Sequence, residues 1–197
     1  NDKRNFTLIK EDQTSNSEYI SRLLENDLFV ASACNKCVSR QFILANNLYF
    51  KKGIRSEDMD WCGRILYLMP SMTCYNKNPY VYRQQVSGSI TASVDITHIR
   101  DIIQMIRTAQ YNSENLEAKE KKIYLSFFAI QYLTLLFNIN SEKFDNFPDL
   151  HNEVKDLRNI LKNDLNYKVK AANKFMKFIG FNLTSKLLRQ YVMIKRG

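Results

Sequence analysis

The feature that most constrains the fold is the run of residues 123–137, which is apolar almost all round. A helix needs ~20 predominantly apolar residues to cross a bilayer, and this run is shorter. It also holds three polar residues, Ser126, Gln131 and Thr134. The run therefore predicts a helix buried at the centre of a folded domain rather than a membrane span.

From Asp95 onward the sequence predicts helices, because apolar residues recur at helical spacing. The first apolar stripe comprises Ile96, Ile99, Ile103 and Ile106. Pro148 fits the first position of a later helix. The stripe of that helix comprises Leu150, Val154, Leu157, Leu161 and Leu165. With only 5 Gly and 3 Pro in 197 residues, the chain favours long helices over tight turns.

Two more helices are expected at the C-terminal end of the chain. The first is predicted to turn Phe175, Met176 and Ile179 into the core. Thr184 or Ser185 is expected to cap the second. The last helix ends in Met193-Ile194-Lys195-Arg196, an apolar edge followed by cations. That pattern favours weak, salt-sensitive contact with an anionic membrane surface.

The N-terminal region mixes short helices with short strands. Ser15 and Glu18 form a capping box for a helix that buries Tyr19, Ile20, Leu23, Leu24 and Leu28. A second short helix is predicted from Ser39 to Asn46. Short strands are predicted at Phe6–Ile9, Met72–Tyr75 and Tyr80–Arg83. The expected fold class is mainly α with a few short β-strands (α+β), divided near Ala92-Ser93 into residues 1–93 and 94–197.

An acidic pair begins one helix of this region. Ser56 is a suitable N-cap, so Glu57 and Asp58 fall in the first helical turn, and Pro70 ends the helix. A carboxylate fixed at a helix start after a loop is a common mount for a catalytic base. The alternative is that both acids only complement the helix dipole.

The cysteines do not indicate a metal or redox centre. Cys34 and Cys37 match C-x-x-C, but Cys62 and Cys74 are not the second close pair that a structural zinc site usually has. No βαβ unit surrounds the motif, as a thioredoxin-like site would require. We expect reduced, partly buried thiols in a cytoplasmic protein.

The formal net charge of +9 is compatible with nucleic acid, an anionic membrane surface or acidic, nucleotide-linked substrates as partners. The cationic residues are spread along the chain, without an arginine-rich arm or an aromatic-interleaved RNA-binding pattern. The sequence therefore argues against nucleic acid as the partner.

Several short motifs occur in one order between Ala33 and Ser93. They are Asn35-Lys36, Phe50, Glu57-Asp58, Tyr80-Val81-Tyr82-Arg83 and Ser87-Gly88-Ser89-Ile90-Thr91. In this order and spacing they resemble the second half of the catalytic domain of bacterial family 2 glycosyltransferases. The resemblance covers roughly a third of the chain. The helical tail resembles, less specifically, the variable C-terminal helices of such enzymes.

The resemblance implies a GT-A-like segment and inverting transfer of a sugar from a nucleotide-sugar to a hydroxyl. By the match, Asp58 is the general base, and Glu57 positions Asp58 or binds the acceptor. Trp61 is expected to offer a stacking face to a sugar ring, with a core aromatic as the alternative.

The remaining motif residues are expected on the substrate side. Arg83 can pair with a donor phosphate, or it is a surface arginine on a hairpin. Tyr82, Asn35 and Lys36 are the other expected substrate-binding residues.

The chain departs from the family pattern in lacking the strand–helix alternation of a nucleotide-binding half. Asp58-Met59-Asp60 opens a helix instead of following an apolar strand, so it is not the metal-binding Asp-x-Asp motif. The chain is therefore expected to be the C-terminal part of a longer transferase and inactive alone. We expect no cofactor in this chain, and Mn or Mg in the longer protein.

The resemblance further implies a nucleotide-sugar donor, a glycan or lipid-linked acceptor, and work in bacterial surface glycan synthesis. The expected location is cytoplasmic, at the inner face of the cytoplasmic membrane. Two other classes stay open: a helical protein-interaction module without catalysis, and a basic nucleic-acid-binding domain. Only the latter predicts steep salt dependence on a generic duplex.

Overall fold

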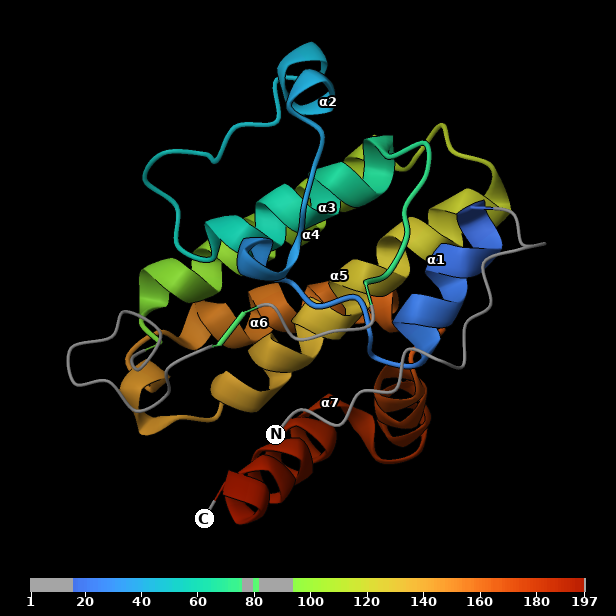
Figure 1. Cartoon of the computed structure of the whole chain (residues 1–197). Coiled ribbons are helices and arrows are strands. Elements are labelled where there is room, and N and C mark those ends of the chain that lie inside the picture. The colour runs from blue at the N-terminus through green and yellow to red at the C-terminus, as the bar shows by residue number, and fades with distance from the viewer. Residues whose placement is uncertain (1–15, 76–79, 82–93, 197) are drawn as a thin grey trace. The chain divides into compact units, whose positions relative to one another are not determined.

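The computed structural model describes residues 16–75, 80–81 and 94–196. The chain divides into two compact units, Asn1–Ser93 and Val94–Gly197. The described residues form seven α-helices, with short 3₁₀ segments and no strand (Figure 1). The mainly helical prediction is therefore confirmed, while no GT-A-like segment is visible among these residues.

The strand predicted at Met72–Tyr75 is wrong, because residues 71–75 have no regular structure. An isolated pair of short strands is marginal in water unless a further strand or a helix packs on it, and Tyr75 is exposed. Tyr80 and Val81 are not in a strand either. The predicted strand Phe6–Ile9 and the residues Tyr82 and Arg83 lie outside the described residues.

In the first unit, helix α1 (Asn16–Glu25) has the predicted apolar face. Its buried residues are Tyr19, Ile20, Leu23 and Leu24, and Leu28 beyond it is also buried. The side-chain amide of Asn16 donates to the carbonyl of Met69 at 3.2 Å. This bond joins the start of α1 to the end of helix α3. Ser15 lies outside the described residues.

Helices α2 (Arg40–Ala45) and α3 (Glu57–Leu68) form where the sequence predicted them. The Ser39 hydroxyl caps α2 by accepting from the backbone N–H of Phe42 at 3.4 Å. Helix α3 stops just before Pro70, as expected, because proline has no N–H to continue the ladder. The buried face of α3 comprises Asp60, Trp61, Cys62, Gly63, Ile65 and Leu66.

The second unit is built around helix α5 (Ala118–Asn138), as the apolar run predicted. Helix α4 (Ile96–Asn112), the 3₁₀ segment η5 (Leu157–Lys162) and helix α7 (Tyr167–Arg196) all pack on α5. Asp95 caps α4 by accepting from the N–H of His98 at 3.0 Å. Among the described residues, no helix is long and apolar enough to cross a membrane.

Tyr132 anchors α5 to helix α6 (Pro148–Asp156). Its hydroxyl donates to the Val154 carbonyl at 2.8 Å, and burial raises the pKa of this phenol above its usual range. Pro148 begins α6, as predicted. The α-helix ends at Asp156 and continues as 3₁₀ turns rather than running on to Leu165, although Leu157 and Leu161 remain buried.

Helix α7 is two helices joined at Gly180, whose φ of 77° and ψ of 177° are non-helical. Figure 1 shows the break in the red C-terminal segment. Two helices were predicted, but their details were wrong. Thr184 does not cap the second, because its hydroxyl donates back to the carbonyl of Gly180 at 2.7 Å. Ser185 likewise donates to the Asn182 carbonyl.

The inward face predicted for the first half of α7 is also wrong. Phe175 and Ile179 are exposed, whereas Val169 and Ala172 are buried. This half carries apolar residues on two opposite faces, and the face with the smaller side chains is the one that packs.

Candidate functional site

The acidic pair begins α3 directly after a residue in an unusual conformation. Ser56 occupies the predicted N-cap position with a φ of 59° and a ψ of 38°, in the left-handed region. Its hydroxyl makes no capping bond to α3. Its carbonyl accepts from the N–H of Met59 at 2.9 Å, which closes the first turn. A non-glycine residue at positive φ is uncommon and costs free energy.

Asp58 is half-buried and hydrogen-bonded to a segment distant in sequence. Its Oδ2 accepts the backbone N–H of Ala33 at 3.2 Å. Ala33 begins the 3₁₀ segment η2 (Ala33–Asn35), which packs on α3. The neighbouring Glu57 side chain is exposed. The fold thus brings the Glu57-Asp58 pair to the turn that carries Asn35 and Lys36.

The Lys36 side chain folds back onto that turn and hydrogen-bonds several of its oxygen atoms. Its ammonium donates to the carbonyls of Val30 and Ser32 and to the side-chain oxygen of Asn35. It also lies 4.7 Å from the centroid of the Phe29 ring. Several acceptors thus converge on one ammonium, which has three N–H donors. The arrangement favours a role for Lys36 in shaping the turn that presents the Ala33 N–H, while Asn35 remains exposed.

Cys62 lies beneath the same turn, one helical turn after Asp58. Burial raises the pKa of the Cys62 thiol to about 11, the nearby Lys36 ammonium opposes this rise, and the Asp58 carboxylate adds to it. The charges of Lys36 and Asp58 therefore act on one buried thiol.

The four cysteines are free, with Cys34 and Cys37 exposed. In the described part of the chain no three His, Cys, Asp or Glu residues are grouped to hold a metal ion. The C-x-x-C motif is thus an exposed pair of thiols.

Trp61 is a core residue with a fixed orientation. Its side chain is 6% exposed, and its indole N–H donates to the Leu48 carbonyl at 2.8 Å. One face stacks on Phe50, with 5.2 Å between the ring centroids and 28° between the planes. Phe50 itself is 50% exposed. Of this stacked pair, Phe50 is the ring that presents an open face.

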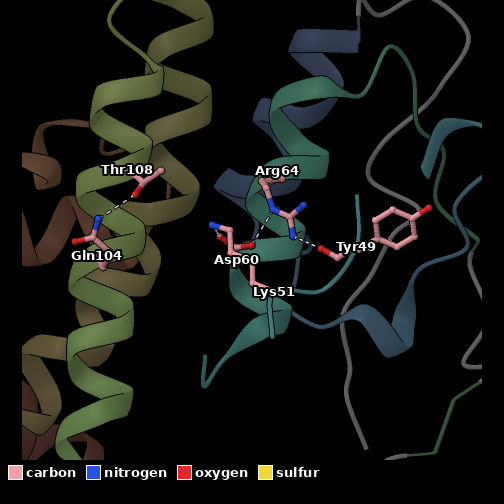
Figure 2. Close-up of polar contacts among 6 residues, drawn as sticks. All are labelled: Tyr49, Lys51, Asp60, Arg64, Gln104 and Thr108. Carbon is pink, nitrogen blue, oxygen red and sulfur yellow. Dashed lines mark hydrogen bonds and ion pairs between the residues drawn. The ribbon is translucent and has the colours of Figure 1, made fainter. Parts of the chain in front are cut away.

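Asp60 belongs to an ion-pair network that sequence reasoning missed. Its carboxylate, only 6% exposed, accepts from Lys51 Nζ at 2.6 Å and from Arg64 Nε at 2.8 Å. Arg64 also donates to the Tyr49 carbonyl at 2.6 Å (Figure 2). The one available signal was the i, i+4 spacing of Asp60 and Arg64. Two cations neutralise this buried carboxylate, so it does not resemble an open metal ligand.

The close-up also shows a weak contact on α4, within the second unit. Gln104 Nε2 donates to Thr108 Oγ1 at 3.4 Å, one turn further along the exposed side of the helix (Figure 2). Nothing about this contact indicates a site.

The site therefore consists of Asp58 and Glu57 at the start of α3 and the turn shaped by Lys36. The exposed ring of Phe50 stacks on Trp61 of the same helix. The expected substrate-binding residues Tyr82 and Arg83 lie outside the described residues. No family model, no curated protein and no solved structure matches the chain.

Proposed function

We propose that this chain is the acceptor-side, C-terminal part of an inverting glycosyltransferase, with Asp58 as its general base. The observation that carries the proposal is the hydrogen bond from the Ala33 N–H to Asp58 Oδ2. It places Asp58 against the 3₁₀ segment η2, which contains Asn35 and immediately precedes Lys36. Two of the motifs that resemble family 2 glycosyltransferases, Asn35-Lys36 and Glu57-Asp58, therefore lie in neighbouring segments.

The position and hydrogen bonding of the Asp58 carboxylate suit proton abstraction. Oδ2 accepts one backbone N–H, which holds the group in one orientation, and we assign Oδ1 to the acceptor hydroxyl. Half-burial limits competition from water without removing the group from reach of a substrate.

The proposed reaction is the one that the resemblance implies. Oδ1 of Asp58 takes the proton of the acceptor hydroxyl while the hydroxyl oxygen forms a bond to C1 of the donor sugar. The bond from C1 to the diphosphate oxygen breaks on the opposite face, and the diphosphate leaves with the bonding electrons. Attack opposite the leaving group inverts the configuration at C1.

The backbone before the acidic pair is compatible with this role, although Asp27 and Asn47 also have a positive φ. Ser56 holds the left-handed conformation at a cost of about 1 kcal/mol or more. Strain of this kind clusters at functional sites, where it fixes the entry of a side chain. At Ser56 it sets the angle at which the chain enters α3, and hence the direction of Asp58.

Neighbouring groups complete the acceptor side. The exposed Glu57 can hydrogen-bond a second hydroxyl of the acceptor. Phe50, rather than the buried Trp61, offers a ring face on which a sugar can stack. Asn35 is exposed beside the same turn and can donate through its amide.

The donor side belongs to the longer protein that we propose. There a Mn or Mg ion would neutralise the diphosphate of a nucleotide-sugar, and Arg83 would assist. The acceptor would be a glycan or a lipid-linked sugar in bacterial surface glycan synthesis, made at the cytoplasmic face of the membrane.

The test is turnover in the full-length protein with a panel of nucleotide-sugars. Asp58→Asn should lower kcat by about a hundredfold or more with donor affinity unchanged, because only the base is removed. Glu25→Gln, an exposed acid at the end of α1, is the matched control and should keep wild-type turnover. If Asp58→Asn retains near-wild-type turnover, the residue is a helix-start acid and the alternative of a helical interaction module gains support.

A further inference from the structure

The net charge of the chain is concentrated in one helix. Residues 167–197 contain no Asp or Glu. They contain eight cations: Lys168, Lys170, Lys174, Lys177, Lys186, Arg189, Lys195 and Arg196. Residues 1–166 hold all 20 acids and the other 21 cations, so they are nearly neutral. The net charge of +9 therefore comes almost entirely from the eight cations of α7.

The first half of α7 presents apolar side chains away from the core. Its outward stripe runs at i, i+4, i+8 and i+11 through Tyr167, Ala171, Phe175 and Phe178. Phe178 is 79% exposed. The opposite face, with Val169 and Ala172, is the one that packs in the unit.

The second half repeats the same arrangement after Gly180. Its outward stripe has the same spacing and runs through Leu183, Leu187, Tyr191 and Ile194. Ile194 is 80% exposed, whereas Phe181 on the opposite face is buried. Both halves of α7 thus have one face that packs in the unit and one apolar face that is largely exposed.

Cations flank both stripes. Lys174 and Lys177 lie beside the first, and Lys186 lies beside the second. Arg189 instead lies over the Phe137 ring of α5, 5.9 Å from its centroid. Lys186 and Arg189 also line an open cavity of about 740 Å³, together with His151 and Asn140, against one acid, Asp145. The side-chain N–H₂ of Asn140 is buried and has no hydrogen-bond partner among the described residues. A phosphate oxygen can accept from the Lys186 ammonium and the Arg189 guanidinium at the open side of the cavity.

We propose that α7 binds the surface of an anionic phospholipid bilayer, with its two apolar stripes in the boundary between headgroups and acyl chains. Exposed apolar area and flanking cations without any acid are the two requirements for such binding. This inference does not depend on the proposed catalytic role of Asp58.

Charge and side-chain type distinguish a bilayer from other occupants. A second copy of α7 would bring eight further cations against the same face. A nucleic acid would match the charge, and the exposed rings of Phe175 and Phe178 in the first stripe could stack on bases. The second stripe favours a bilayer, because Leu183, Leu187 and Ile194 can neither read base edges nor stack on bases. Aliphatic side chains beside cations match the acyl–headgroup boundary.

Co-sedimentation of the 197-residue chain with lipid vesicles tests the proposal. We expect binding to vesicles of phosphatidylcholine mixed with phosphatidylglycerol, at least tenfold weaker binding to phosphatidylcholine alone, and loss of binding at high salt. Equal binding to both vesicle types, or none to either, would overturn the proposal.

Paired variants test whether vesicle binding depends on the stripes and cations of α7 or on exposed apolar area and net charge anywhere on the surface. Phe178→Ser with Leu187→Ser should reduce vesicle binding at least tenfold, whereas Tyr111→Ser with Leu44→Ser, at exposed apolar positions elsewhere, should not. Lys174→Glu with Lys177→Glu should have the same effect as the first pair. Lys119→Glu with Lys155→Glu changes the net charge equally and should have little effect.

All these positions are exposed, and unchanged thermal melts will show that each variant folds. Two further outcomes count against the lipid surface. One is tighter binding to a generic DNA duplex than to the anionic vesicles. The other is a stable dimer by light scattering that Phe178→Ser with Leu187→Ser dissociates, without vesicle binding by the wild-type chain.

Discussion

The backbone N–H of Ala33 lies 3.2 Å from the carboxylate of Asp58, and the two residues are 25 positions apart. The bond ties the turn of η2 to the first turn of α3. It therefore gives Asp58 two roles, one in structure and one in the proposed chemistry. Variants that differ only in hydrogen-bonding capacity can separate them.

Asp58→Asn should change the free energy of unfolding little, because the amide oxygen can still accept from Ala33. Asp58→Ala removes the acceptor and should cost about 1 kcal/mol more. In the full-length protein both variants should lose turnover equally, because neither has a base. Urea denaturation and initial rates measure the two quantities. Turnover that followed stability instead would mean that Asp58 acts only through the fold.

Cys62 should be the least reactive thiol of this site. Its pKa is raised from an ordinary 9.0 to about 11 by burial, so almost none of it is thiolate at pH 8. Iodoacetamide followed by peptide mass spectrometry should find Cys34 and Cys37 labelled at pH 8, and Cys62 labelled only near pH 11 or after denaturation. Labelling of Cys62 as fast as Cys34 at pH 8 would contradict the burial.

The same shift has a consequence for stability. The folded state favours the protonated thiol, so the contribution of Cys62 is fully present below pH 9 and declines as the pH rises to about 11. Cys62→Ala should flatten this part of the stability curve in urea titrations at several pH values. An unchanged curve would assign the loss to other groups.

Tyr132→Phe should destabilise the second unit by about 1 kcal/mol. The change removes the 2.8 Å hydrogen bond from the hydroxyl to the Val154 carbonyl, which still accepts from the backbone N–H of Leu157. Tyr111→Phe removes a hydroxyl from an exposed position on α4 and serves as the control, with an effect under about 0.5 kcal/mol. Urea denaturation monitored by circular dichroism provides the measurement. Equal effects of the two variants would argue against the buried bond.

Gly180→Ala should destabilise the protein by about 1–3 kcal/mol. A φ of 77° with a ψ of 177° is a conformation that essentially only glycine adopts. A Cβ at this position would meet no atom within 4 Å, so the cost is conformational rather than steric. Asn182→Ala, at an exposed position just beyond the break, should not destabilise. A more stable Gly180→Ala protein would indicate that α7 runs straight.

Local patterns were enough to predict most of the helices. Pro70, Asp95 and Pro148 each set a helix boundary through their own backbone or side-chain chemistry, and the structure confirms all three. The central position of α5 followed from an apolar surface that only burial can satisfy. These features depend on neighbours in sequence, which is why the sequence alone can predict them.

Features that depend on distant partners could not be predicted in the same way. Both faces of the first half of α7 are apolar, and only packing on α5 decides that Phe175 faces outward. The bonds of Lys36 to the carbonyls of Val30 and Ser32 require a turn that no local spacing indicates. The meeting of Ala33 and Asp58 likewise depends on the path of the chain between them.

The burial of Asp60 limits which substitutions could restore a catalytic base after Asp58 is lost. Asp58 and Asp60 are two residues apart, so Asp60 is the nearest acid in sequence that could replace a lost Asp58 beyond the neighbouring Glu57. Asp60 cannot serve as that replacement, because Lys51 and Arg64 already hold its carboxylate inside the first unit. Second-site suppressors of an Asp58 substitution should therefore not arise from freeing Asp60. In the proposed reaction, Asp60 therefore cannot replace Asp58 as the general base.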